Sequence, residues 1–153
     1  MILVVGAGIS IFAQTRGPQA AFTSDQTEAG RTLLRSNKFG ACTDCHGPAL
    51  LGRDQKGLPD DPPISSLPEN FQKTIRMGYI PQLVGPAFVA RWRDRSTKEL
   101  SAGFPMRFDG ALTREQQMSL MAFILQMNGA LPGQVALTMD TDVPIGALLP
   151  TSK

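Results

Sequence analysis

Both cysteines and the only histidine of this chain lie within one short segment, Cys42-Thr43-Asp44-Cys45-His46. No other thiol or imidazole exists among the 153 residues, so any site that uses these groups must lie in this segment. A structural zinc site needs about four such ligands, which the chain cannot supply. A thioredoxin-type redox pair belongs to a βαβ pattern, and this sequence has none. A simple disulfide would leave His46 without a role.

The order Cys-x-x-Cys-His is the attachment pattern of c-type haem. Two thiols add to the two vinyl groups of the porphyrin, and the adjacent imidazole becomes an axial ligand of the iron. On this interpretation Cys42 and Cys45 form the covalent bonds and His46 binds the metal. The motif therefore predicts one covalent haem c, and a fold that must enclose a large, flat, apolar group.

The composition also narrows the second axial ligand of the iron. Because no second histidine exists, methionine sulfur is the remaining common choice. Of the seven methionines, three lie at helical spacing near residues 118–127, where methionine is usually a core residue, and two lie at the start of the chain and in its tail. Met106, in a loop 60 residues after His46, is the preferred candidate. Met77 and an open sixth position are the alternatives.

Length and charge fit one small domain without a nucleic-acid partner. The chain is 42% hydrophobic and has a formal net charge of +2, which is too small to attract a polyanion. A local basic run comprises Arg91, Arg93, Arg95 and Lys98. We interpret it as a solvated helix face, and a docking patch for an acidic redox partner is the alternative.

The amino-terminal segment, residues 1–13, is apolar and uncharged. It is too short to span a bilayer and is typical of a signal peptide; a short retained anchor, associated with a membrane surface, is the alternative. We therefore expect a periplasmic or otherwise exported protein, which suits haem attachment outside the cytoplasmic membrane. Residues 14–23 are polar and predict a linker to a domain over residues 24–153.

Hydrophobic spacing predicts an all-α domain with long loops. A first helix is expected after Ser24, with an apolar stripe of Ala29, Leu33 and Leu34. Residues 53–63 predict a surface loop, and Pro68 suits the first position of a helix that turns Phe71, Thr74 and Ile75 inward.

Two capping boxes mark later helices. Ser96 and Glu99 predict a short helix, and Thr113 and Gln116 predict the longest one, with a broad apolar face, which Asn128-Gly129 closes. The tail, residues 131–153, is interrupted by proline and glycine and is expected to wrap the surface.

Four sequence segments carry a family resemblance. They are Gly30-x-x-Leu33, the haem motif with Gly47, Leu50 and Gly52, the string Pro81-x-Leu83-x-Gly85-Pro86-Ala87-Phe88-x-x-x-Trp92, and residues 120–133. In them the chain resembles class I cytochromes c, and more narrowly the small periplasmic cytochromes that accompany quinoprotein (PQQ-type) dehydrogenases.

The resemblance implies a cytochrome c fold in which the first and last helices cross closely at Gly30. It implies that the carbonyl of Pro81 accepts a hydrogen bond from the His46 ring. Relative to the family, residues 53–79 look like an insertion. Candidates to line the haem pocket are Trp92, Phe88, Phe104 and Leu125, for which ordinary core packing is the alternative.

The expected function is transfer of one electron at a time from a periplasmic dehydrogenase to a terminal oxidase or second cytochrome. An enzyme acting on a small substrate is not expected, because the only histidine is committed to iron. Two alternatives remain: a haem module that binds or senses a small ligand at an open sixth site, and an electron-entry subunit held within a dehydrogenase complex.

Overall fold

The computed structural model of the chain describes residues 20–35, 42–52, 63–77, 80–103 and 112–150. Within these ranges no β-strand occurs, and two isolated bridges join Thr23 to Gly133 and Ser96 to Pro144, which agrees with the predicted all-α class. The elements in chain order are α1 (Ser24–Arg35), α2 (Cys42–His46), the 3-10 turn η2 (Ile64–Ser66), α3 (Glu69–Arg76), α4 (Pro86–Trp92), α5 (Thr97–Gly103), α6 (Arg114–Met127) and α7 (Ile145–Leu148).

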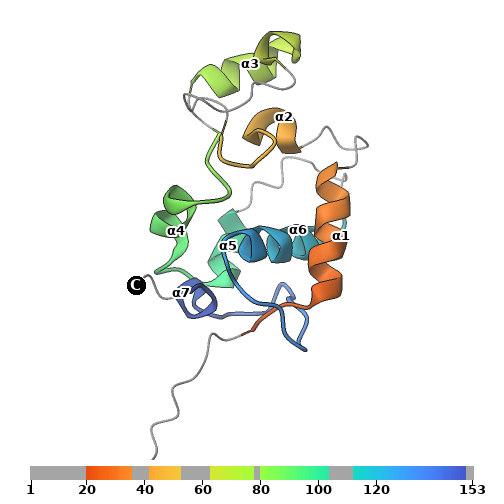
Figure 1. Ribbon diagram of the computed structural model, residues 1–153, viewed down its shortest axis with the longest axis vertical. Helices are drawn as coiled ribbons and strands as arrows, with labels where there is room; N and C mark the ends of the chain where they lie inside the picture. The colour runs from red at the N-terminus through yellow and green to blue at the C-terminus, as the bar shows by residue number, and fades with distance from the viewer. Residues whose placement is uncertain (1–19, 36–41, 53–62, 78–79, 104–111, 151–153) are drawn as a thin grey trace, which may run out of the picture.

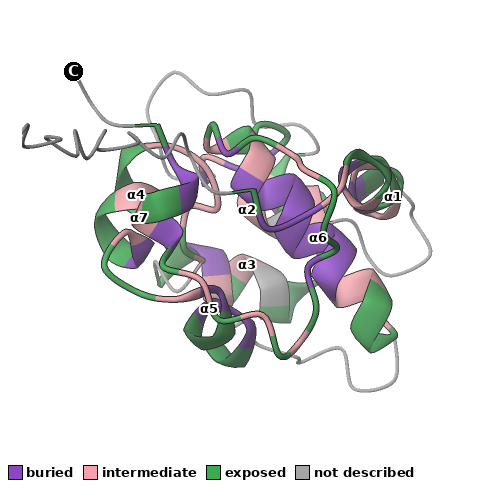
Figure 2. Cartoon of the chain, turned by 90° about the horizontal axis from the view of Figure 1, so that it is seen from below, coloured by how far each residue is buried: buried purple, intermediate pink, exposed green. Residues whose placement is uncertain are grey.

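Helix α6 is the centre of the core (Figures 1 and 2). Every residue from Met118 to Leu125 is buried, so the helix is enclosed on all sides rather than on the one broad face that its spacing predicts. A helix that is apolar all round needs partners all round, because any uncovered side would leave apolar surface in water. The rest of the fold supplies those partners.

Helix α1 crosses α6 at a steep angle and contacts it closely (Figure 1). The contact is made at Gly30, where an added Cβ would lie 2.1 Å from the backbone oxygen of Ser119 and 2.9 Å from the Cβ of Phe123. The expectation that Gly30 allows the two helices to approach is therefore confirmed. No other amino acid fits this position without a shift of the backbone.

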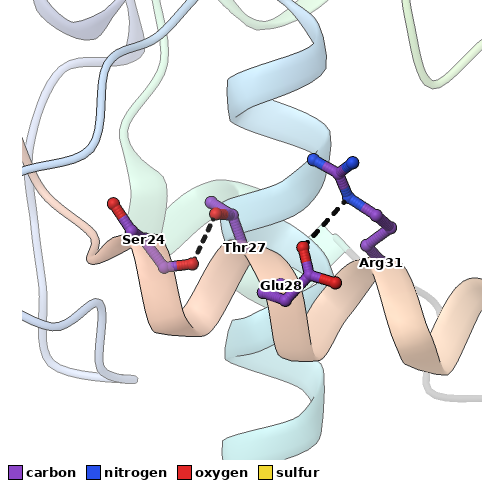
Figure 3. A network of polar contacts seen from close by, with 4 residues as sticks. All are labelled: Ser24, Thr27, Glu28 and Arg31. Carbon is purple, nitrogen blue, oxygen red and sulfur yellow. Dashed lines mark hydrogen bonds and ion pairs between the residues drawn. The ribbon is translucent and has the colours of Figure 1, made fainter.

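The predicted apolar stripe of α1 is wrong in part. Ala29 is exposed and Leu33 is half-buried, whereas the buried residues are Thr27, Gly30 and Leu34. The reason is the closeness of the crossing, which selects small residues at the contact. Thr27 can be buried there because its hydroxyl donates a hydrogen bond of 2.7 Å to the carbonyl of Ser24 (Figure 3).

At the edge of the same crossing Arg31 covers an aromatic ring. Its guanidinium carbon lies 5.7 Å from the centroid of Phe123, and its Nε forms an ion pair of 3.3 Å with Glu28 one turn earlier (Figure 3). The arginine stem thereby shields apolar surface while its charge stays partnered.

Capping boxes begin three of the helices. The boxes predicted at Ser96 and at Thr113 are both present, with reciprocal side-chain and backbone hydrogen bonds to Glu99 and Gln116. A third box, Thr23 with Gln26, begins α1 one residue earlier than predicted. Each box satisfies backbone N–H groups that the first helical turn leaves without partners.

Helix α4 was not predicted, although its start carries a recognisable signal. Pro86 occupies the first turn, where a missing N–H costs nothing, and Gly85 precedes it with φ of 94°. The helix buries Phe88 and Trp92 against the main core.

The tail does not simply wrap the surface, as predicted, but completes the core. Its buried residues are Leu137, Ile145, Leu148 and Leu149. The backbone amides of Ile145 and Gly146 donate to the carbonyls of Arg95 and Arg93, at 2.8 and 2.9 Å. These long-range bonds fix the tail beside the α4–α5 connection, and sequence spacing cannot reveal them.

Helix α3 lies at the other end of the molecule, with α2 between it and α6 (Figure 1). Of the residues predicted to face inward, Ile75 is buried and Thr74 half-buried, and the side chain of Phe71 lies outside the described part. Pro68 is the N-cap rather than the first helical residue. In the described ranges, no helix is long and apolar enough to cross a membrane.

We expect Gly30→Ala to destabilise the protein by about 2 kcal/mol or more, because the new methyl group overlaps the backbone of α6. In an ordinary helix the same change stabilises by up to about 1 kcal/mol, so the sign of the effect is diagnostic. Urea unfolding measures it. Thr32→Ala, at an exposed position of the same helix, is the control and should change stability by less than about 0.5 kcal/mol. A stabilised Gly30→Ala protein would contradict the close crossing.

Candidate functional site

The Cys-x-x-Cys-His segment forms the short helix α2. Within it Cys42 and Cys45 are three residues apart and Cys42 and His46 are four apart, spacings that place residues on one side of a helix. The backbone thus brings two thiol-bearing positions and an imidazole to one helical turn, as the sequence suggested. The side chain of Cys45 lies outside the described part.

The chain turns back immediately after α2. Gly47, Leu50 and Gly52 have φ values of 77°, 60° and 87°, and the amide of Gly52 donates to the carbonyl of His46 at 2.9 Å. A left-handed, fully buried leucine is unusual, and the two glycines allow the turn at little steric cost. This turn anchors the main chain of His46.

The His46 ring is held by the carbonyl oxygen of Pro81, which lies 2.8 Å from Nδ1. A carbonyl can only accept, so Nδ1 carries the proton and the lone pair is on Nε2. The contact that the resemblance implied is therefore confirmed. It is the arrangement in which a histidine presents one nitrogen to a metal while the other is fixed by a hydrogen bond.

The environment of His46 favours the neutral ring. Burial lowers the pKa of His46 below its usual range, and the hydrogen bond to Pro81 opposes this with a smaller effect. Neutral imidazole is the form that binds metals, so the burial favours a ligand role.

The side chain of Cys42 packs against an apolar cluster built from distant parts of the chain. The fully buried members are Leu34, Leu50, Leu120 and Phe123, and the partly buried ones besides Cys42 are Leu33, Leu83, Val84 and Leu112. The thiol therefore adjoins apolar side chains from α1, α6 and three loops. The sequence named several of these residues in helix patterns or in the resemblance segments, but it did not indicate that they gather beside Cys42.

Three of the four residues proposed from the sequence to line a haem pocket are described, and all three are core residues. Phe88, Trp92 and Leu125 belong to the larger core cluster, while Phe104 lies outside the described residues. The larger cluster still approaches the Cys42 cluster, because Leu83 packs against both.

Of the two methionine candidates, only one can be placed. Met77 caps the C-terminus of α3 and is 49% exposed, and Met106 lies outside the described residues. Among the three helical methionines, Met118 and Met121 are core residues as predicted, but Met127 is 46% exposed.

The basic run is organised around Trp92. The guanidinium carbons of Arg91 and Arg95 lie 5.4 and 5.2 Å from its ring centroid, and Arg93 donates to the carbonyl of Pro150 at 3.1 Å. Lys98 is exposed on α5. Three of the four cations are thus engaged within the fold, in cation–π contacts or a hydrogen bond.

Comparison of the chain with protein-family models, with curated proteins and with solved structures finds no match. Functional inference therefore depends on the residues of the site and on the resemblance in its motifs.

We expect Gly85→Ala to destabilise the protein by about 1–3 kcal/mol. Gly85 has φ 94° and ψ −170°, a conformation essentially restricted to glycine, and an added Cβ would lie 3.2 Å from a methyl group of Leu51. Chemical denaturation measures the change, and Ala87→Ser on the exposed side of α4 is the control. Equal stabilities for the two variants would show that the turn at Gly85 is not constrained.

Proposed function

We propose that this chain is a single-haem c-type cytochrome that carries one electron at a time. The observation that supports this most is the hydrogen bond from His46 Nδ1 to the Pro81 carbonyl, within a Cys-x-x-Cys-His helix. It leaves Nε2 as the available nitrogen of a ring whose orientation is fixed.

The residues present fit a covalently attached haem. Cys42 and Cys45 would form the thioether bonds, and His46 would be the first axial ligand. The apolar cluster beside Cys42 offers the walls that a porphyrin face requires and would exclude water from it. When bound, the haem supplies a ferric–ferrous couple, which is the one-electron chemistry of the protein.

For the sixth ligand we propose Met106, with Met77 as the alternative. Met77 is the C-cap of α3, where its side chain is 49% exposed. Methionine ligation would raise the reduction potential and suit a carrier that delivers electrons to an oxidase.

We propose a periplasmic or otherwise exported location, with residues 1–13 as the signal peptide or anchor. The electron donor would be a periplasmic dehydrogenase of the quinoprotein class, and the acceptor a terminal oxidase or a second cytochrome. No step of substrate chemistry is assigned to this chain.

Covalent haem is the first test. Expression in a bacterium that exports and matures c-type cytochromes should give a protein whose haem survives acid–acetone extraction, in a ratio of about one per chain. Cys42→Ser and Cys45→Ser should each weaken or abolish retention, because each removes one of the two thioether bonds. Ser101→Ala is a control distant from the motif in sequence. A wild-type protein that matures without covalent haem would refute the proposed function.

The sixth ligand is tested by optical spectra of the oxidised protein. We expect the weak far-red band of sulfur-to-iron ligation in the wild type and its loss in Met106→Ala. Survival of the band in Met106→Ala but not in Met77→Ala would assign Met77 instead. A high-spin wild type that binds carbon monoxide rapidly when reduced would favour the ligand-binding haem module over the electron carrier.

A further inference from the structure

The side chain of Asn128 joins the end of α6 to the loop that carries Pro81. Its Oδ1 accepts from the amide of Gly85 at 2.9 Å, and its Nδ2 donates to the carbonyls of Leu83 at 3.0 Å and of Ile124 at 2.8 Å. Both amide protons are therefore used, and the pattern of donors and acceptors fixes the orientation of the amide group.

The loop from Pro81 to Gly85 is also held by packing, because Leu83 contacts both apolar clusters and Val84 contacts the cluster beside Cys42. Its other polar contacts include two hydrogen bonds. The amide of Leu83 donates to the carbonyl of Leu50 at 2.9 Å, and the carbonyl of Pro81 accepts from His46 at 2.8 Å. Both of these partners belong to the segment that carries the imidazole. Asn128 is different, because it extends from a helix that the core surrounds on every side.

The hydrogen bonds of Asn128 therefore connect the backbone next to the Pro81 carbonyl to the end of α6. Asn128 binds the backbone carbonyl of Leu83, which is only two residues from Pro81. It also binds the backbone amide of Gly85, two residues further along the loop. A side-chain amide that binds two backbone groups of a loop restricts both the translation and the rotation of that loop. Without it, the loop would keep the packing of Leu83 and its hydrogen bonds to the His46 segment, but it would lose its polar connection to α6.

We propose that Asn128 is a positioning residue for the axial histidine: it holds the Pro81 carbonyl where the Nδ1–H of His46 can donate to it. This inference rests on the proposed function where it concerns the reduction potential. A ring whose Nδ1–H is well hydrogen-bonded is a stronger electron donor through Nε2 and stabilises an oxidised metal more than a reduced one. Loss of the clamp should therefore raise the reduction potential.

The test compares Asn128→Leu with the wild type. Leucine has nearly the same size and no charge, so it removes the three hydrogen bonds without adding an electrostatic effect. We expect the reduction potential to rise by an amount equivalent to about a three- to tenfold change in the redox equilibrium constant. We also expect the Nδ1 proton of His46 to exchange with solvent about tenfold faster, as NMR would measure. Asn128→Ser, which can keep one bond, should give smaller changes in the same direction and serves if Asn128→Leu does not fold.

Thr113→Ala is the matched control, because it removes the capping box at the opposite end of the same helix and does not touch the loop. It should lower stability by about 1 kcal/mol and leave both the potential and the exchange rate unchanged. If the Asn128 variants likewise lower stability and leave the reduction potential and the exchange rate unchanged, Asn128 has only a structural role and the proposal is overturned.

Failure of the proposed function can be distinguished from failure of this inference. A wild type without covalent haem would refute the cytochrome assignment, and the ring tautomer of His46 would then be read by nitrogen NMR in the purified protein. An unchanged Nδ1-protonated fraction in Asn128→Leu would overturn the positioning role, and a decreased fraction would support it.

Discussion

The burial of α6 is the constraint on which the packing of the other elements depends. Because the helix is enclosed from Met118 to Leu125, each of its sides must be covered by another part of the chain. Helix α1 covers one side through the contact at Gly30, and the tail with α7 covers another. Burial of apolar surface contributes about 25 cal/mol per Å² to the stability of the fold. Leaving one side of α6 exposed to water would therefore be costly for a domain of this size.

The candidate site lies at the margin of this packing rather than inside it. Phe123 and Leu120 face the cluster that adjoins Cys42, while their neighbours Ile124 and Leu125 belong to the main core. One helix thus contributes to both clusters on adjacent faces. The site shares apolar residues of α1 and α6 with the core, and it adds the turn after α2 and the loop at Pro81.

Local signals predicted the parts of the fold that local physics decides. The capping boxes at Ser96 and Thr113 were identified correctly because a capping box is complete within four residues. The predicted stripe of α1 was wrong at Ala29, because the contact face of α1 is selected by the close approach of Ser119, from a distant helix. The burial of the tail was missed for a similar reason, since backbone bonds to Arg93 and Arg95 hold it.

The candidate site likewise has parts that local sequence predicts and parts that depend on distant contacts. The motif itself places Cys42, Cys45 and His46 in one short helix, and the Pro81 contact followed from the family resemblance rather than from spacing. No pattern in the sequence links Asn128 to Leu83 and Gly85, which lie 45 and 43 residues earlier. The smaller apolar cluster likewise collects residues from four separated segments, which only the folded chain brings together.

The pairing of the two ends of the domain has a consequence for the order of events during folding. Gln26 exchanges hydrogen bonds with both backbone groups of Leu137, across 111 residues of sequence. Contacts of such separation make folding slow, because the entropy of closing a long loop is lost before the contacts stabilise the product. The larger core cluster cannot be completed until the tail has been synthesised, because Leu137, Ile145, Leu148 and Leu149 belong to it. As the structure describes it, the smaller cluster beside Cys42 contains no tail residue, so it can form before the larger core cluster is complete.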